Sequence, residues 1–304
     1  MRLLRFVAAI LTLALPAAAW NFSGHWIVAE IAYERLTPQA RERVDELIRR
    51  HPDFERFTKD GPADPAALAR YAFVRAASWP DQIISDNRFY DETRADAEPT
   101  PLLPGFPDMM RHRTWHYYDI PISGDDTPVL EQQPPHLLTE LPRLLGELMK
   151  VSPMQATYDL PWIEHLVGDS HQPLHATSRY LKSQPKGDAG GNFVFVQDGP
   201  TLHGLWDNAA APRDLSDEDV MRYAREITAE YPAQDLGSLD PKEWMIESFE
   251  LDKSTVYTFG LETGSKELPL VMPPGYEEKA KSVGRQRVAL AGYRLAAVLN
   301  HLYH

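Results

Sequence analysis

The sequence predicts an all-α protein: a single, mainly helical domain with long loops and at most a short β-hairpin. Three observations lead to this prediction. Apolar residues recur at helical spacing through most of the chain, and helix-start signals such as Thr37-Pro38 precede some of these runs. Neither an internal repeat nor a linker divides the chain. Its 304 residues, 43% of them hydrophobic, are enough to build one core.

The expected elements are mostly helices joined by polar segments. The first helix begins with Ser23 as its N-cap, and the others are expected over 38–50, 66–78, 137–150, 157–170, 217–230, 242–258 and 277–302. The segments 87–126 and 182–192 are rich in Pro, Asp or Gly, which predicts loops. The apolar run that includes Phe193 and Phe195 predicts a short strand.

The first nineteen residues predict a secretory signal peptide over 1–19, followed by a functional domain over 20–304. Arg2 and Arg5 precede an apolar run, and alanines end the segment at Ala19, where cleavage is expected. The alternative is a membrane anchor. It is disfavoured because the apolar run is shorter than the roughly 20 residues that span a bilayer. We therefore expect a secreted or periplasmic protein.

The chain has no cysteine and a net charge of −13. The absence of cysteine excludes thiolate zinc sites, so a metal ion must be held by histidine, carboxylate or backbone groups. Removal of Arg2 and Arg5 takes two positive charges from −13 and leaves −15. This charge disfavours nucleic-acid binding through a basic surface. Bound divalent cations would nevertheless supply positive charge where a phosphate binds.

Two histidine–aspartate pairs share a four-residue spacing. His165 and Asp169 form one pair and His203 and Asp207 the other, and on a helix each pair points to one side. His175 follows a proline turn that lets it return to the first pair. A lone histidine is more often a structural residue than a ligand. Two such pairs in a cysteine-free chain, however, predict zinc held by imidazole and carboxylate.

Cleavage after Ala19 would give Trp20 a free α-amine, whose ordinary pKa is about 7.7–8.0. A nearby cation would deprotonate this amine, and the amine and the Trp20 carbonyl would then chelate one ion. His25 lies five residues further on and is close enough in sequence to join them. The alternative is that Trp20 is an ordinary first residue packed on the surface.

Six ordered sequence elements make the chain similar to the single-strand-specific zinc nucleases of the S1/P1 type, a family related to bacterial zinc-dependent phospholipase C. The resemblance covers essentially the whole chain from Trp20 onward. The six elements are Trp20 with His25, Trp79-x-Asp81, His116-x-x-Asp119, His165 with Asp169 and His175, Gly187-Asp-x-Gly-Gly-Asn192, and His203 with Asp207.

The resemblance implies three zinc ions (Zn²⁺), with Asp169 as a bridge between two of them. The implied ligands are Asp81, His116, His165 and Asp169 for the first ion, His175, His203 and Asp207 for the second, and Trp20, His25 and Asp169 for the third. The resemblance also implies that Asp119 lies beside the attacking water and that Asn192 contacts the phosphate. Tyr117 would stack on a base or simply pack.

The resemblance further implies a secreted endonuclease that cuts single-stranded RNA and DNA to 5′-phosphorylated products by metal-activated hydroxide, with 3′-nucleotidase activity. Two alternatives stay open: a zinc-dependent phospholipase C-like phosphodiesterase, and a non-catalytic zinc-binding secreted protein. They stay open because Ile84 occupies the position of an arginine with which the family often contacts phosphate. We expect a monomer without stable membrane association, since the negative charge disfavours an anionic membrane surface.

Overall fold

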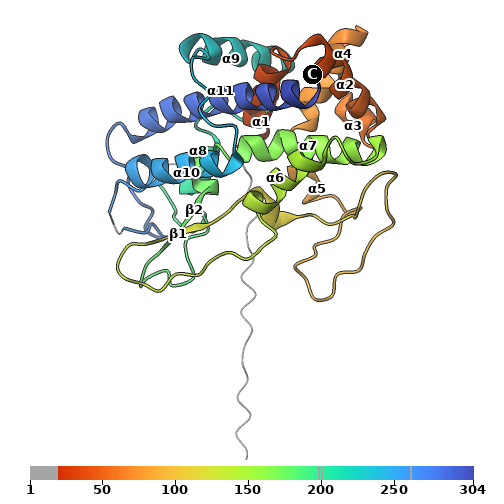
Figure 1. Cartoon of the computed structure of the whole chain (residues 1–304). Helices are drawn as coiled ribbons and strands as arrows, with labels where there is room; N and C mark the ends of the chain where they lie inside the picture. Colours follow the sequence, from red (N-terminus) through yellow and green to blue (C-terminus); the bar gives the residue numbers. More distant parts are fainter. Residues whose placement is uncertain (1–19, 198, 200, 261) are drawn as a thin grey trace, which may run out of the picture.

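The computed structural model describes residues 20–304 except residues 198, 200 and 261, so the predicted signal peptide lies outside the described residues. Within the described part the protein is mainly helical, which confirms the predicted fold class (Figure 1). The α-helices are α1 (Phe22–Tyr33), α2 (Pro38–Arg50), α3 (Phe54–Phe57), α4 (Pro65–Ala76), α5 (Trp79–Ile83), α6 (Leu137–Glu147), α7 (Pro153–Asp169), α8 (Leu202–Asp207), α9 (Asp217–Glu230), α10 (Pro241–Leu251) and α11 (Tyr276–Leu302). The short turns and strands are η1 (Arg113–His116), β1 (Ile120–Ser123), η2 (Pro173–His175), β2 (Thr177–Tyr180) and η3 (Asp252–Val256).

The first helix starts at Phe22 with Asn21 as its N-cap, so the prediction of Ser23 as the N-cap is wrong. The Asn21 side chain accepts a hydrogen bond from Gly24 N at 3.0 Å, which satisfies a free amide of the first turn. Ser23 lies inside the helix, where its hydroxyl oxygen accepts a hydrogen bond from Leu215 N at 3.0 Å. The sequence did not show this distant partner.

The other predicted helices are present, with shifts at some of their ends. α2 and α9 have the predicted bounds. α7 begins before the predicted start because Ser152 caps it and Pro153 fits its first turn. The helix predicted over 242–258 ends at Leu251 and continues only as the short π-helical turn η3.

The small sheet forms within and beside segments that the sequence did not identify as strands. β1 lies inside the predicted loop 87–126 and pairs in parallel with β2, with Ile120 opposite Thr177. The two strands are therefore a parallel pair that needs the whole of α6 and α7 as its crossover, rather than a hairpin.

The strand predicted at Phe193 and Phe195 is wrong. In this segment the chain forms only an isolated bridge between Val196 and Leu270. Val194 and Val196 are buried, whereas Phe193 is 38% exposed. The apolar run therefore reflects packing of a loop against the core and not pairing in a sheet.

α7 lies at the centre of the helical body and packs against α1, α2, α6 and α11 (Figure 1). It is buried on all sides from Ala156 to Asp169, as expected for a helix in the middle of a core. β1, β2 and the long loops gather on one side of this body (Figure 1). No helix within the described ranges has the length and the hydropathy needed to cross a membrane. The surrounding helices thus enclose α7, which carries the first predicted ligand pair, His165 and Asp169.

Candidate metal centre

The last turns of α7 carry His165 and Asp169 on one face of the helix. Both side chains are fully buried, and His165 Nε2 lies 3.2 Å from Asp169 Oδ2. Gly168 lies between them in sequence and leaves space for a ring from α1, because a Cβ at this position would lie 2.7 Å from His25 Nδ1. The sequence of α7 therefore builds a polar pocket inside an otherwise apolar core.

Asp81 and His116 join this pair from two short elements, α5 and η1. His116 Nδ1 lies 2.9 Å from His165 Nε2 and 3.3 Å from Asp169 Oδ2. Asp81 Oδ1 lies 3.6 Å from His165 Nε2 and 3.7 Å from His116 Nδ1. The four residues predicted to hold the first ion therefore lie together, although they come from three separate parts of the chain.

His25 approaches the same pocket from α1. Its ring stacks on that of His165 with centroids 3.9 Å apart, and its Nε2 lies 3.3 Å from Asp169 Oδ1. The two oxygens of Asp169 thus face different histidines: Oδ1 faces His25, and Oδ2 faces His116 and His165.

Trp20 lies beside this pocket and is fully buried, so the alternative of a surface position does not hold. Its indole Nε1 donates a hydrogen bond to Gly168 O at 3.0 Å. The next backbone amide, Asn21 N, donates to Asp207 O at 3.1 Å. The start of the described chain is therefore held between the segments that carry Asp169 and Asp207.

The second histidine–aspartate pair lies on α8, which the sequence did not identify as a helix. His203 Nε2 lies 3.5 Å from Asp207 Oδ1, and His175 from η2 completes a buried group of three potential metal-binding side chains. His175 Nδ1 lies 4.0 Å from Asp169 Oδ2, so this group adjoins the first pocket. The Gln172 amide donates to Asp207 Oδ1 at 2.8 Å, a contact that the sequence did not indicate.

Three backbone carbonyls orient three of the histidine rings. Nδ1 of His165, His175 and His203 donates to the carbonyls of Ala77, His116 and Gly190 at 2.8, 2.6 and 2.7 Å, respectively. A carbonyl only accepts, so Nδ1 carries the proton and the lone pair lies on Nε2. Such a partner is typical of metal-binding histidines, because it sets the tautomer and the ring direction.

The donor set fits zinc by its chemistry and by its unsatisfied atoms. Among the described residues, both oxygens of Asp81 and of Asp169 are buried without a hydrogen-bond partner, as are Nε2 of His116 and of His175. Burial raises the pKa of Asp81 and of Asp169 to about 7. Burial also lowers the pKa of His25, His116, His165 and His175. Divalent cations would reverse the penalty on the charged carboxylates and use the neutral imidazoles as ligands.

The remaining predicted site residues are Tyr117 and Asp119, which come after η1, and Asn192, which comes before α8. Burial, and then Asp188, raise the pKa of Asp119 to about 8. Burial, and then Asp119, raise the pKa of Tyr117 to about 12. The Asn192 amide donates to Ala189 O at 2.9 Å within its own loop. Gly190 of that loop holds His203, so the loop is attached to the metal-binding group.

His171 lies between His165 and His175 in sequence but turns away from them. Its Nε2 accepts a hydrogen bond from Arg294 at 2.9 Å, and its Nδ1 donates to Val167 O. Arg287 of α11 donates to His171 O at 3.2 Å. The segment between the two ligand-bearing elements is thus held by α11, which no local sequence signal indicated.

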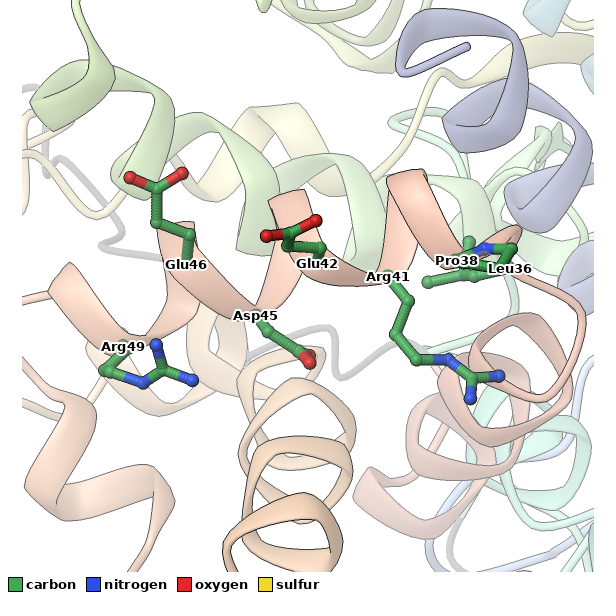
Figure 2. Close-up of a pocket in the computed structure, with 7 residues that line it drawn as sticks. All are labelled: Leu36, Pro38, Arg41, Glu42, Asp45, Glu46 and Arg49. Carbon is green, nitrogen blue, oxygen red and sulfur yellow. The ribbon is translucent and has the colours of Figure 1, made fainter.

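A separate hollow of about 760 Å³ lies along α2, outside the histidine-rich pocket (Figure 2). All of its lining side chains except Leu36 come from α2, and they carry charges of both signs (Figure 2). They are Leu36, Pro38, Arg41, Glu42, Asp45, Glu46 and Arg49. The hollow contains none of the predicted ligands.

Comparisons with known proteins identify the family of the chain. A search of curated proteins gives no match. One similar solved structure is the alpha-toxin of Clostridium perfringens from avian strain SWCP, at 13% identity and a TM-score of 0.38. The match covers 95% of this chain and 65% of the toxin chain, and a likeness this low carries no argument. The family model described as S1/P1 nuclease matches residues 20–304, so the chain belongs to this family of zinc-dependent nucleases.

Proposed function

We propose that the chain is a secreted, trinuclear-zinc endonuclease that hydrolyses single-stranded RNA and DNA to 5′-phosphorylated products and also acts as a 3′-nucleotidase. The observation that carries the proposal is the position of Asp169. One of its oxygens faces His25, and the other faces His116 and His165. A carboxylate in this position is suited to bridge two ions.

The proposed first ion is held by Asp81, His116, His165 and Asp169. The proposed second ion is held by His175, His203 and Asp207. The third is held by His25, Asp169 and the free amine and carbonyl of Trp20. Bound zinc ions would lower the pKa of water and neutralise phosphoryl oxygens, which is the chemistry that phosphodiester hydrolysis needs.

Asp119 is proposed to accept a proton from the attacking water. Its raised pKa, about 8, makes its carboxylate form a stronger base than an ordinary aspartate. Asn192 is proposed to contact the phosphate. Its side-chain amide has two hydrogens, and the bond to Ala189 O uses one of them, so the other can be donated to a phosphate oxygen. Tyr117 is proposed to contact the substrate from beside Asp119.

The proposed mature protein is the domain 20–304, secreted or periplasmic after removal of residues 1–19. It is proposed to be a monomer without stable membrane association. Single-strand preference would follow because an unpaired base can leave its stack and bind in a side pocket.

The test uses the protein that starts at Trp20, loaded with zinc, on single-stranded RNA, single-stranded DNA, 3′-AMP and phosphatidylcholine. We expect new 5′-phosphate ends from both nucleic acids and phosphate release from 3′-AMP. His203→Asn should abolish both, whereas His301→Asn, a change at an exposed position, should leave them intact. Release of a phosphorylated head group alone would favour a phospholipase C-like enzyme. No reaction with any substrate at full zinc content would favour a non-catalytic protein.

A further inference from the structure

Arg113 begins the 3₁₀ turn η1 that ends at His116, a predicted ligand of the first ion. In a 3₁₀ helix the side chains at positions i and i+3 are eclipsed, so Arg113 and His116 leave the turn on the same side. The His116 side chain is 1% exposed and the Arg113 side chain is 25% exposed. Arg113 is therefore the partly exposed residue of a turn whose other end, His116, is buried in the pocket.

The guanidinium of Arg113 has unused hydrogen-bonding capacity. Within the described ranges its one ionic partner is Asp91, with Nε 3.3 Å from Asp91 Oδ2, and its side chain makes no hydrogen bond. Nearby arginines differ: Arg111 donates to Phe89 O, and Arg143 donates to two glutamates. A guanidinium offers five N–H donors in a plane that matches a phosphate group.

Asp91 pairs with this guanidinium but leaves its N–H groups without a hydrogen-bond acceptor among the described residues. The Asp91 side chain itself accepts hydrogen bonds from the backbone and the hydroxyl of Thr93, which fix its direction. A partly exposed ion pair of this kind contributes little free energy to stability. Replacement of Asp91 by a substrate anion as the partner of Arg113 therefore costs little free energy.

Arg113 also adjoins the residues proposed to act on the substrate. Arg113 lies in the turn that ends at His116, and Tyr117 and Asp119 follow this turn directly along the chain. Arg113 thus brings a fixed positive charge to the predicted reaction site of an acidic chain, which has a net charge of −13.

We propose that Arg113 is a phosphate-binding subsite beside the metal centre, where its guanidinium binds a phosphodiester oxygen of the nucleic-acid substrate. This inference rests on the proposed nuclease function. Asp91 is the carboxylate that pairs with the guanidinium until the substrate phosphate replaces it. Arginine suits this role because it binds phosphate through two parallel hydrogen bonds.

The test compares Arg113→Ala, Arg113→Lys and the matched control Arg94→Ala in the zinc-loaded protein. Arg94 lies in the same loop region, is exposed, and forms its ion pair with Asp96 at the surface. We expect Arg113→Ala to raise KM for single-stranded DNA about tenfold or more, with zinc content unchanged and partial rescue by lysine. The slope of log KM against log salt should fall by about 0.7, as for the loss of one phosphate contact on a single strand. Arg94→Ala should change neither quantity.

Asp91→Asn separates phosphate binding from a structural role of the ion pair. If Arg113 binds phosphate, Asp91→Asn frees the guanidinium, and KM should stay equal or fall. If the ion pair only holds the loop, Asp91→Asn and Arg113→Ala should raise KM alike, and this outcome overturns the proposal. A wild-type KM in Arg113→Ala overturns it too. An inactive wild-type protein would instead count against the proposed function itself.

Discussion

Asp169 combines three properties that rarely occur together in one residue. It is fully buried, its oxygens have no hydrogen-bond donor among the described residues, and its oxygens lie 3.2 to 3.3 Å from nitrogens of three histidines. Burial of an unpaired carboxylate is strongly unfavourable. A residue in this position is therefore best explained by cations that are bound in the working protein.

Asp169→Asn should remove two zinc ions at once, because the amide keeps the shape of the side chain but loses the charge that the bridge needs. Zinc per chain, measured by elemental analysis, should fall from three to one. Glu164→Gln is the matched control, since Glu164 is also a buried carboxylate of α7 without a hydrogen-bond partner. It should retain three ions. Loss of only one ion in Asp169→Asn would contradict the bridge.

At the scale of elements, α7 carries acidic groups on more than one face. His165 and Asp169 face the metal pocket, whereas Asp159 faces Arg143 and Glu147 of α6. Burial is the main cause that raises the pKa of Asp159 to about 7, and Glu147 adds to it. The packing of α6 on α7 therefore depends on whether this carboxyl group is protonated.

The sign of this dependence follows from proton linkage. The folded state holds the Asp159 proton up to about pH 7, whereas the unfolded chain releases it near the ordinary value of 3.8. Between these values the folded state binds more protons, so the free energy of unfolding falls as the pH rises. The loss is complete above about pH 7 and is at most about 4 kcal/mol at about 1.4 kcal/mol per pKa unit.

Asp159→Asn cannot ionise, so it should remove this loss. In denaturant unfolding of the zinc-loaded protein, the variant should gain stability relative to the wild type as the pH is raised from 5 to 8. The comparison at each pH cancels the effect of pH on zinc binding. Glu98→Gln, at an exposed position, serves as the control and should give a constant difference. A constant difference for Asp159→Asn would mean that the carboxylate is not destabilising.

At the scale of the whole molecule, the start of the described chain is part of the core. Trp20 is fully buried, and hydrogen bonds tie this start to Gly168 O and Asp207 O. The C-terminal residue His304, by contrast, is exposed. The two ends should therefore respond very differently to an added residue.

One extra residue before Trp20 should remove one zinc ion and most of the activity. The α-amine becomes a peptide nitrogen, which no longer has a lone pair to donate. Zinc per chain and nuclease rate should be measured on proteins that start at Trp20 and at an added Met. A one-residue extension after His304 is the control and should change neither. Three ions and full turnover in the N-terminally extended protein would rule out the terminal chelate.

The sequence alone was sufficient for the local features. Helical spacing predicted α2 and α9 within their observed bounds, and the four-residue spacing of His165–Asp169 and His203–Asp207 predicted pairs that share a helix face. Predictions from local sequence were wrong where a residue distant in the chain determines the local structure. Ser23 was wrong as an N-cap because its hydroxyl is used by Leu215 N, and the apolar run at Phe193 packs as a loop.

What the sequence by itself determined is the helical class, the cysteine-free set of donor groups and the two histidine–aspartate pairs, because these depend on residue type and on spacing within one helix. Tertiary structure alone decided that Asp81, His116 and His25 lie around Asp169, since they come from separate elements. It also decided which carbonyls orient the histidines and that Arg113 pairs with Asp91. The physical reason is that such contacts join distant segments, and only the packing of α1, α5 and η1 on α7 brings them within reach.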